Sequence, residues 1–304
     1  MKKNMKNGLL ALFIGLVLLS GCESKKDTIH IATKPMSEQF ILGEMLALLI
    51  EENSDLHVKI TKGVGGGTSN IHPAMVKGDF DLYPEYTGTG WLVILKKDTL
   101  LPPDQLFSEL QKEYSREYGL KWVAPYGFNN AYSLAVSNEM AKKYNLKTFS
   151  DLALYPDLFT FGAEYDFYEI NDGYADLCAY YNLKFKKNLD MDIGLKYEAM
   201  KSGKIDVINI FTTDGQLSHA NLTTLKDDKH FFPSYYCATI VREETLKEHP
   251  ELEGILEKMN GILTDQEMAD MNYKVDVEHR TEREVAVEFL KKKGLLNPQL
   301  SYGK

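Results

Sequence analysis

Short apolar runs alternate along the chain with longer segments whose apolar positions recur at helical spacing. Runs rich in β-branched and aromatic residues predict strands, and these cover 29–32, 58–60, 80–82, 132–136, 159–162, 205–211 and 237–241. Apolar positions three and four residues apart predict helices, and these cover 37–52, 68–78, 104–118, 138–144, 172–182, 193–202 and most of 251–294. This alternation favours an α/β fold with parallel strands.

Polar and special residues mark where several of these elements should begin or end. Ser37 and Thr68 are suited to cap helix N-termini with their hydroxyl groups. Gly119 follows the helix 104–118 and is typical of a C-terminal stop. Pro84 is expected to end regular strand pairing, because proline lacks the N–H that a strand ladder requires.

Two distant segments repeat one plan. Residues 74–82 read Ala-Met-Val-Lys-Gly-Asp-Phe-Asp-Leu, and residues 199–207 read Ala-Met-Lys-Ser-Gly-Lys-Ile-Asp-Val. The same spacing pairs Tyr86 with Phe211, so each copy predicts a helix end, a glycine turn, a strand and then an aromatic residue. Ligands of open α/β sheets bind outside the carboxyl ends of strands, so two lobes could each offer a ring to one cleft. Such turns also occur in unrelated proteins, and that interpretation stays open.

The N-terminus predicts an export signal and a lipid anchor. Three lysines precede the uncharged apolar run 8–19, which is short for a membrane span and typical of a signal peptide. The run leads into Leu19-Ser20-Gly21-Cys22, which resembles the bacterial lipobox. We expect residues 1–21 to be removed, Cys22 to carry diacylglycerol, and 22–27 to form a polar tether on the outer face of the cell membrane. The alternative is an ordinary signal peptide with an incidental cysteine.

Composition narrows the possible functions. The chain has 304 residues, of which 44% are hydrophobic and 26% charged, as in a globular protein of about two domains. A formal charge of -9 disfavours binding to nucleic acid. Besides Cys22 there are only Cys178 and Cys237, which either pair or, more simply, are buried free thiols. Metal-ligand spacings, HExxH and GxSxG are absent, so the sequence predicts neither a metal site nor a catalytic centre.

Aromatic residues gather at the predicted strand ends. The chain has 18 tyrosines against 2 tryptophans, and aromatic residues recur in the segments 83–90, 129–132, 211–215 and 232–236. Rings from such distant segments could form a box for a quaternary ammonium group, whose diffuse charge and methyl groups suit the faces of aromatic rings. The plainer alternative is that these rings are core residues.

Several motifs occur together between about residues 28 and 296. They are Ser37-Glu38-Gln39, Gly65-Gly66-Gly67-Thr68, Asp81 to Thr89, Asn129-Asn130-Ala131-Tyr132, Asp172-Gly173-Tyr174, Gly194 to Ala199, Thr213-Asp214-Gly215 and Phe231 to Tyr235. Together they resemble the glycine betaine, choline and carnitine substrate-binding lipoproteins of osmoprotectant ABC transporters. The resemblance implies a two-lobed fold of the type II periplasmic binding protein kind, with a mixed sheet flanked by helices in each lobe.

The resemblance also implies how the mature chain is divided and what it does. Lobe 1 would contain 28–128 and 233–304, lobe 2 would contain 129–232, and crossings near Asn130 and Pro233 would form a hinge. The protein would perform no chemistry and need no cofactor. It would deliver a quaternary ammonium solute, such as glycine betaine, choline or carnitine, to a separate permease driven by a cytoplasmic ATPase.

In this family an aromatic cage surrounds the quaternary ammonium group. By resemblance, the cage corresponds to Tyr86, Tyr132, Phe211 and Tyr235, and the polar contacts to the rest of the ligand correspond to Lys34, Gln39, Thr89 and Asn130. The competing hypothesis is an exported lipoprotein hydrolase that uses the same cage for choline-type esters. Such an enzyme needs a nucleophile and a base close together, and the sequence shows no recognisable pair.

Two positions depart from the family pattern. Phe211 stands where tyrosine is usual, so the ring face remains but the hydroxyl group is lost. Ile170 stands where some relatives have an arginine that holds the ligand carboxylate. Losing that charge-assisted contact weakens binding of a carboxylate. Choline, which has no carboxylate, therefore remains an alternative to glycine betaine and carnitine.

The substitution Ile170→Arg should raise the ratio of glycine betaine affinity to choline affinity. A guanidinium group adds a charge-assisted hydrogen bond that only the carboxylate ligand can accept. Calorimetric titration of both ligands into both proteins measures the ratio, and a ratio that does not rise contradicts this account of position 170.

Overall fold

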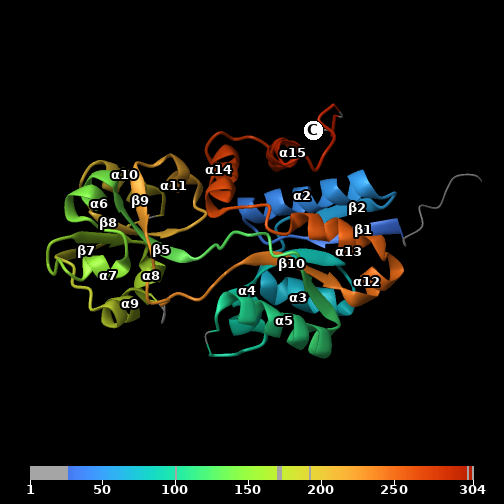
Figure 1. The fold of residues 1–304 in the computed structure, drawn as a ribbon, viewed down its shortest axis with the longest axis horizontal. Helices are drawn as coiled ribbons and strands as arrows, with labels where there is room; N and C mark the ends of the chain where they lie inside the picture. Colours follow the sequence, from blue (N-terminus) through green and yellow to red (C-terminus); the bar gives the residue numbers. More distant parts are fainter. Residues whose placement is uncertain (1–26, 100, 170–172, 192, 300, 303–304) are drawn as a thin grey trace, which may run out of the picture.

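A computed structural model describes residues 27–99, 101–169, 173–191, 193–299 and 301–302 of the chain. The predicted signal peptide, the lipidation site Cys22, nearly all of the tether, and Ile170 lie outside the described residues. The described residues form two lobes, each built on a five-stranded sheet with helices on both faces (Figure 1).

Each lobe contains one mixed sheet. Lobe 1 has the strand order β2-β1-β3-β10-β4, and lobe 2 has the order β7-β6-β8-β5-β9. The strands are β1 (Thr28–Ala32), β2 (His57–Thr61), β3 (Leu82–Tyr86), β4 (Leu120–Val123), β5 (Tyr132–Ser137), β6 (Thr160–Ala163), β7 (Lys187–Asp190), β8 (Val207–Phe211), β9 (Leu222–Leu225) and β10 (Cys237–Arg242). Parallel pairs join β1 to β2 and β3, and β6 to β7 and β8, whereas β10 and β5 run antiparallel to their neighbours. The sheets are therefore not purely parallel, because β5 and β10 return the chain from the other lobe.

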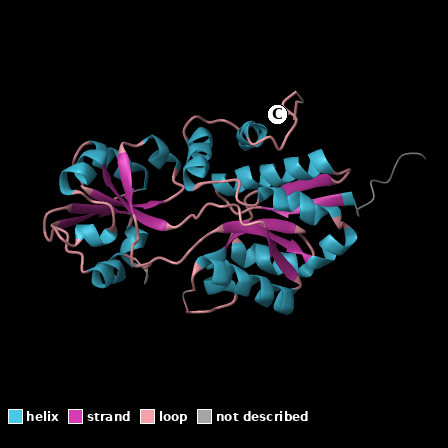
Figure 2. Cartoon of the chain, in the orientation of Figure 1, coloured by secondary structure: helices cyan, strands magenta, loops and turns pink. Residues whose placement is uncertain are grey.

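Helices cover both faces of each sheet (Figure 2). They are α2 (Ser37–Asn53), α3 (Thr68–Lys77), α4 (Thr87–Thr89), the π-helical η3 (Gly90–Ile94), α5 (Pro103–Tyr118), α6 (Asn138–Tyr144), α7 (Phe149–Leu152), α8 (Tyr165–Glu169), α9 (Tyr174–Tyr181), α10 (Ile193–Lys201), α11 (Gly215–His219), α12 (Glu243–Glu248), α13 (Glu251–Leu256), the 3-10 turn η4 (Glu257–Met259), α14 (Asp265–Asp276) and α15 (Glu282–Lys292). In lobe 1, α2, α13 and α15 form one apolar core with the sheet, and α3 and α5 form the other.

Strand residues alternate between the two cores of lobe 2. Leu134 and Val136 of β5 pack with helices α7, α8 and α9, whereas Ala135 packs with α10 on the opposite face. The same division separates Val207 from Ile208 in β8. This period of two is what a strand buried on both faces requires, and it explains why β5 and β8 are almost continuously apolar in sequence.

The predicted repeat is confirmed. Helix α3 is followed by Gly78 and helix α10 by Gly203, with φ of 89° and 69°, in the region that favours glycine. Each turn leads into the central strand of its sheet, β3 or β8, and these strands end in Tyr86 and Phe211. The two lobes therefore share one plan, and their aromatic residues occupy matching strand ends.

The predicted caps at Ser37 and Thr68 are wrong. The residue before each of them occupies the N-cap position, and neither hydroxyl group caps its own helix. The Ser37 hydroxyl instead donates a hydrogen bond to Asp276 of α14, and Thr68 Oγ1 donates to Glu85 Oε2 at 2.6 Å. Both side chains are used to join distant segments rather than to satisfy local backbone groups.

The predicted break at Pro84 is also wrong, whereas the predicted stop at Gly119 is confirmed. Pro84 lies inside β3, opposite Thr239 of β10, and β1 pairs with β3 only at Leu82. The missing N–H of the proline therefore interrupts little of the ladder. Gly119 closes α5 in a left-handed conformation with φ of 63°.

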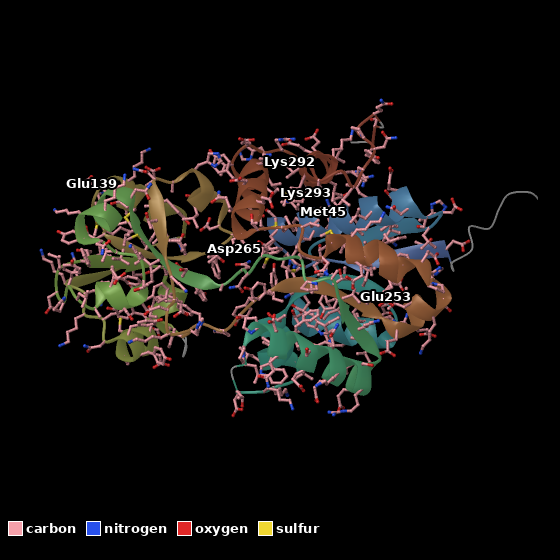
Figure 3. All side chains as sticks on the ribbon, viewed as in Figure 1. Met45, Glu139, Glu253, Asp265, Lys292 and Lys293 are labelled. Atoms are coloured by element: carbon pink, nitrogen blue, oxygen red, sulfur yellow. The ribbon has the colours of Figure 1, made fainter. Side chains whose placement is uncertain are left out.

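Within the described residues the chain passes between the sheets at two places, between β4 and β5 and between β9 and β10. These crossings are hydrogen-bonded to each other. Asn130 N donates to Tyr235 O at 3.1 Å, Tyr235 N donates to Asn129 Oδ1 at 2.6 Å, and Asn129 forms a bridge with Tyr236. Asp265, which lies between the lobes in Figure 3, accepts a hydrogen bond from Asn129 N at 2.8 Å.

Helix α14 follows the second crossing in sequence but also packs on lobe 2, against α11 (Figure 1). The rings of His219 and Tyr273 stack with centroids 3.7 Å apart. A Cβ atom added at Gly215 would lie 2.7 Å from the backbone nitrogen of Tyr273, so the contact requires glycine. Helix α14 therefore touches both lobes.

Cys178 and Cys237 are both free thiols, as predicted, but only Cys237 is buried, whereas Cys178 is half-buried. Across the described ranges, no helix has both the length and the apolar character needed to cross a membrane.

The substitution Gly127→Ala should lower the free energy of unfolding by about 2–4 kcal/mol. Gly127 has a φ of 107°, and a Cβ atom there would lie 2.5 Å from the carbonyl oxygen of Leu263. Urea unfolding measures the change. The control is Gly254→Ala, because Gly254 lies within α13 with open space beside it and alanine favours a helix by about 0.5–1 kcal/mol. Equal stabilities for the two variants would contradict the prediction.

Candidate ligand-binding site between the lobes

Lobe 2 presents two aromatic rings side by side. Tyr132 begins β5 directly opposite Phe211, the last residue of β8. Their ring centroids lie 4.4 Å apart with an interplanar angle of 30°. Phe167 and Phe232 support the Tyr132 ring at 5.2 Å and 5.7 Å. These rings form an aromatic wall at the edge of the lobe 2 core.

Lobe 1 contributes Tyr86 and Tyr235. Tyr86 ends β3 opposite Cys237, and Tyr235 lies two residues before β10. Both rings belong to the same apolar cluster, and Tyr86 is only 6% exposed. Gly88 allows the close packing, because a Cβ atom there would lie 2.6 Å from the Tyr235 ring. The four predicted cage residues are thus divided between the lobes, two in each, beside the chain crossings.

Lys34 lies beside the Tyr86 ring with its charge already paired. Its ammonium nitrogen lies 4.7 Å from the ring centroid and forms an ion pair with Glu85. Glu85 is fully buried and also accepts hydrogen bonds from Thr68 Oγ1 at 2.6 Å and Tyr86 N at 2.7 Å. Lys34 is therefore not a free cation, although the family resemblance implied a direct contact with a ligand. Glu85 was not among the residues expected from the sequence. Its position inside an otherwise apolar strand could have revealed it.

The other three predicted polar residues differ in burial and in hydrogen bonding. They are Gln39, Asn130 and Thr89. Gln39 is fully buried, and its Oε1 accepts a long hydrogen bond of 3.4 Å from Lys34 N. Within the described part of the chain, Gln39 Nε2 and Asn130 Oδ1 have no hydrogen-bond partner. Thr89 is half-buried at the end of α4. Unpaired buried polar atoms are costly, so these two atoms are suited to receive a ligand.

Glu38 is a buried carboxylate that the sequence pattern did not single out. It is 3% exposed and accepts hydrogen bonds from the Tyr86 hydroxyl at 2.5 Å, from Asn130 Nδ2 at 3.0 Å and from Asn272 Nδ2 at 3.3 Å. Burial raises the pKa of its carboxyl group above the usual 4.5, although these donors oppose the shift. The motif Ser37-Glu38-Gln39 was noticed as a unit, but nothing local indicated that Glu38 would meet three distant segments.

The cavities of the molecule do not coincide with the position of the four predicted cage rings. A pocket of about 300 Å³ lies beside Gly88 and Ser234, next to the lobe 1 rings, and is lined mainly by apolar side chains that include Trp91 and Phe232. A larger hollow of about 920 Å³ lies on lobe 2 between α6, α10 and α11. None of the predicted cage residues lines it, so the candidate site lies at the rings and not in this hollow. No cluster of His, Cys, Asp or Glu suited to a metal ion occurs among the described residues.

Comparison with known proteins gives this geometry a context. Residues 27–292 match the OpuAC family, described as the substrate binding domain of the ABC-type glycine betaine transport system. The chain belongs to the OpuAC family. This match confirms the family resemblance inferred from the sequence motifs.

Two relatives of this OpuAC chain differ in the ligand that their names give. The ergothioneine transport permease/ergothioneine binding protein EgtU of Helicobacter pylori is 46% identical over 287 residues, which cover 94% of this chain and 51% of that protein. The chain thus spans about half the length of EgtU. The carnitine transport binding protein OpuCC of Listeria monocytogenes is 36% identical over 301 residues, which cover 95% of this chain and 97% of that protein.

A solved structure confirms the fold. The crystal structure described as a glycine betaine/carnitine/choline ABC transporter superposes with a TM-score of 0.84 at 32% identity, covering 88% of this chain and 99% of the other. The chain therefore has the predicted two-lobed fold of type II periplasmic binding proteins. Its OpuAC relatives are binding proteins of transporters rather than enzymes, which removes the hydrolase hypothesis.

Proposed function

We propose that this protein is the extracytoplasmic binding component of an ABC importer for quaternary ammonium compounds. Family membership supports the role of a binding component. The observation that carries the ligand class is the division of the aromatic rings into Tyr132 and Phe211 on lobe 2 and Tyr86 and Tyr235 on lobe 1. A methylated ammonium ion offers no N–H to donate, and the faces of aromatic rings attract it by about 0.5–2 kcal/mol each.

Lobe closure then completes the site. Rotation about the two crossings brings the two ring pairs onto opposite sides of one trimethylammonium group and excludes water from it. The two crossings are hydrogen-bonded to each other at Asn130 and Tyr235, directly beside the cage. This supports a hinge at that point. We propose that the lobes have the limits expected from the sequence, 28–128 with 233–304 and 129–232.

The polar end of the ligand is assigned to the remaining predicted residues. Gln39 Nε2 is a buried donor without a partner in the described structure, and Asn130 Oδ1 is a matching acceptor. Thr89 supplies a hydroxyl group at the end of α4. Lys34 contributes a positive charge that it shares with Glu85, so its attraction for a ligand carboxylate is reduced.

Within the quaternary ammonium class, glycine betaine, carnitine and choline remain the expected ligands. The 46% identity to a protein named for ergothioneine adds that compound as a further candidate. Ergothioneine carries the same trimethylammonium group and a carboxylate, so the proposed cage suits it as well. The apolar pocket of about 300 Å³ beside Gly88 offers space for a bulkier end group.

The proposed partners and location follow from the family and the N-terminal motif. A permease with a cytoplasmic ATPase would receive the ligand from the closed form. Diacylglycerol on Cys22 would hold the protein on the outer face of the cell membrane, because two acyl chains anchor far more stably than one.

A thermal-shift panel of choline, glycine betaine, carnitine, proline betaine and ergothioneine tests the ligand class. A ligand that binds only the folded protein stabilises it by about 2.7 kcal/mol at a concentration of 100 Kd. We therefore expect at least one member of the panel to raise the melting temperature by about 5 °C or more. Proline, which lacks the methylated nitrogen, serves as the control. Absence of any shift across the panel contradicts the proposed function.

The substitutions Tyr86→Ala and Tyr235→Ala should each weaken binding of the preferred ligand by about tenfold or more, because each removes one ring face from the cage. Calorimetry measures the affinity, and circular dichroism confirms that the variants remain folded. The matched control is Tyr180→Ala, since Tyr180 is 52% exposed on α9. Unchanged affinity in both cage variants contradicts the cage.

A further inference from the structure

Among the residues that the structure describes, only neutral groups hold Glu38. Its partners are the Tyr86 hydroxyl, the amide nitrogens of Asn130 and Asn272, and the side chain of Thr213. These donors come from β3, from the first crossing, from α14 and from the loop after β8. Among the described residues, Glu38 takes part in no ion pair at 4.0 Å or less. A buried carboxylate is normally paired with a cation, because neutral donors only partly replace its hydration.

The other charges around Glu38 do not supply this cation. Lys34 is the nearby ammonium group, and its ion pair with Glu85 is completed by the hydroxyl of Thr68. The Tyr86 hydroxyl and the Cys237 thiol also face this region from β3 and β10, and burial raises the pKa of both groups well above their usual values. Both groups therefore stay uncharged near neutral pH. Lys34, Glu85 and Glu38 together leave one negative charge without a partner.

The missing cation would lie next to Tyr86. A cation bound to an aromatic face lies within about 6 Å of the ring centroid. The Tyr86 hydroxyl donates directly to Glu38 Oε1 at 2.5 Å, so a cation on this ring lies close to the carboxylate. Lys34 already lies 4.7 Å from the centroid of this ring, but its charge is balanced by Glu85, so a ligand cation is the one that would balance Glu38. The site is buried, and attraction between opposite charges at such distances is much stronger there than in water.

We propose that Glu38 is the counter-ion for the positively charged head of the ligand. The proposal rests on the cage described above and adds a second reason why the cage selects a charged ammonium group over a group of the same shape that lacks the charge. The faces of the aromatic rings already favour a trimethylammonium group over a tert-butyl group. The carboxylate increases this preference.

A purely structural role for Glu38 is the alternative. In that case the carboxylate only holds Tyr86, Asn130 and Asn272 together, and its loss weakens every ligand of the cage by the same factor. The two roles are separated by pairs of ligands that differ only in charge. Choline pairs with 3,3-dimethyl-1-butanol, and glycine betaine pairs with 3,3-dimethylbutanoate, in which carbon replaces the ammonium nitrogen.

The experiment compares the wild type with Glu38→Gln, which keeps the shape and an acceptor oxygen but removes the charge. We expect Glu38→Gln to weaken choline or glycine betaine by about tenfold or more. The affinity for the matching carbon analogue, which lacks the ammonium charge, should fall by less than about threefold. The matched control is Glu44→Gln on the same helix, because Glu44 is paired with Lys62 and Arg283 at 2.9 Å. This control should leave the affinity for choline unchanged.

The pH profile of the wild type supplies a second readout that needs no variant. Burial raises the pKa of Glu38, so the free protein keeps the proton to a higher pH than an exposed glutamate does. Ligand binding favours the ionised carboxylate and releases that proton. Choline affinity should therefore fall as pH is lowered from 8 toward 4.5, whereas 3,3-dimethyl-1-butanol affinity stays level. Glu38→Gln should remove the slope for choline.

The outcomes distinguish this proposal from the cage itself. A wild type that binds no member of the thermal-shift panel overturns the proposed function and the counter-ion together. A wild type that binds choline or glycine betaine, with Glu38→Gln weakening the ammonium ligand and its carbon analogue equally or not at all, overturns the counter-ion and leaves the cage intact. A selective loss of the charged ligand supports both.

Discussion

The position of the candidate site depends on the register between each returning antiparallel strand and the strand beside it. In lobe 2, Tyr132 begins β5 opposite Phe211, and in lobe 1, Cys237 begins β10 opposite Tyr86. Side chains alternate between the faces of a strand, so a shift of one residue in either pairing would turn these rings to the wrong face. The pairing that completes each sheet therefore also places the rings where the chain leaves for the other lobe.

The two pairs of rings differ in the groups behind them. Tyr132 is supported by Phe167 and other rings, so the lobe 2 pair offers apolar contact area. Tyr86 has an ammonium group from Lys34 beside its face and the Glu38 carboxylate at its hydroxyl. In the proposed site, lobe 2 supplies apolar contact area and lobe 1 supplies charged groups. A ligand must satisfy both before closure becomes favourable.

Local sequence patterns predicted the alternation of elements because most strands and helices are defined by burial of their own periodic faces. The repeat at 74–82 and 199–207 was visible for the same reason, since a glycine turn between a helix and a strand is a local feature. Ser37 and Glu38 were misjudged or missed because their partners lie far along the chain, in α14 and at Tyr86. Family resemblance located the rings, but burial and pairing of charge arise only when distant segments meet.

Helix α14 contacts both lobes and so affects how they can move relative to each other. Gly215 lets the backbone of lobe 2 touch this helix, while Asn272 hydrogen-bonds both to Glu38 of lobe 1 and to the carbonyl of Thr213 at 2.8 Å. Within the described residues, α14 therefore adds a non-covalent contact to the two chain crossings between the lobes. In the proposed hinge motion, any rotation that separates α14 from α11 must break the hydrogen bond from Asn272 to Thr213 and the stacking of His219 on Tyr273.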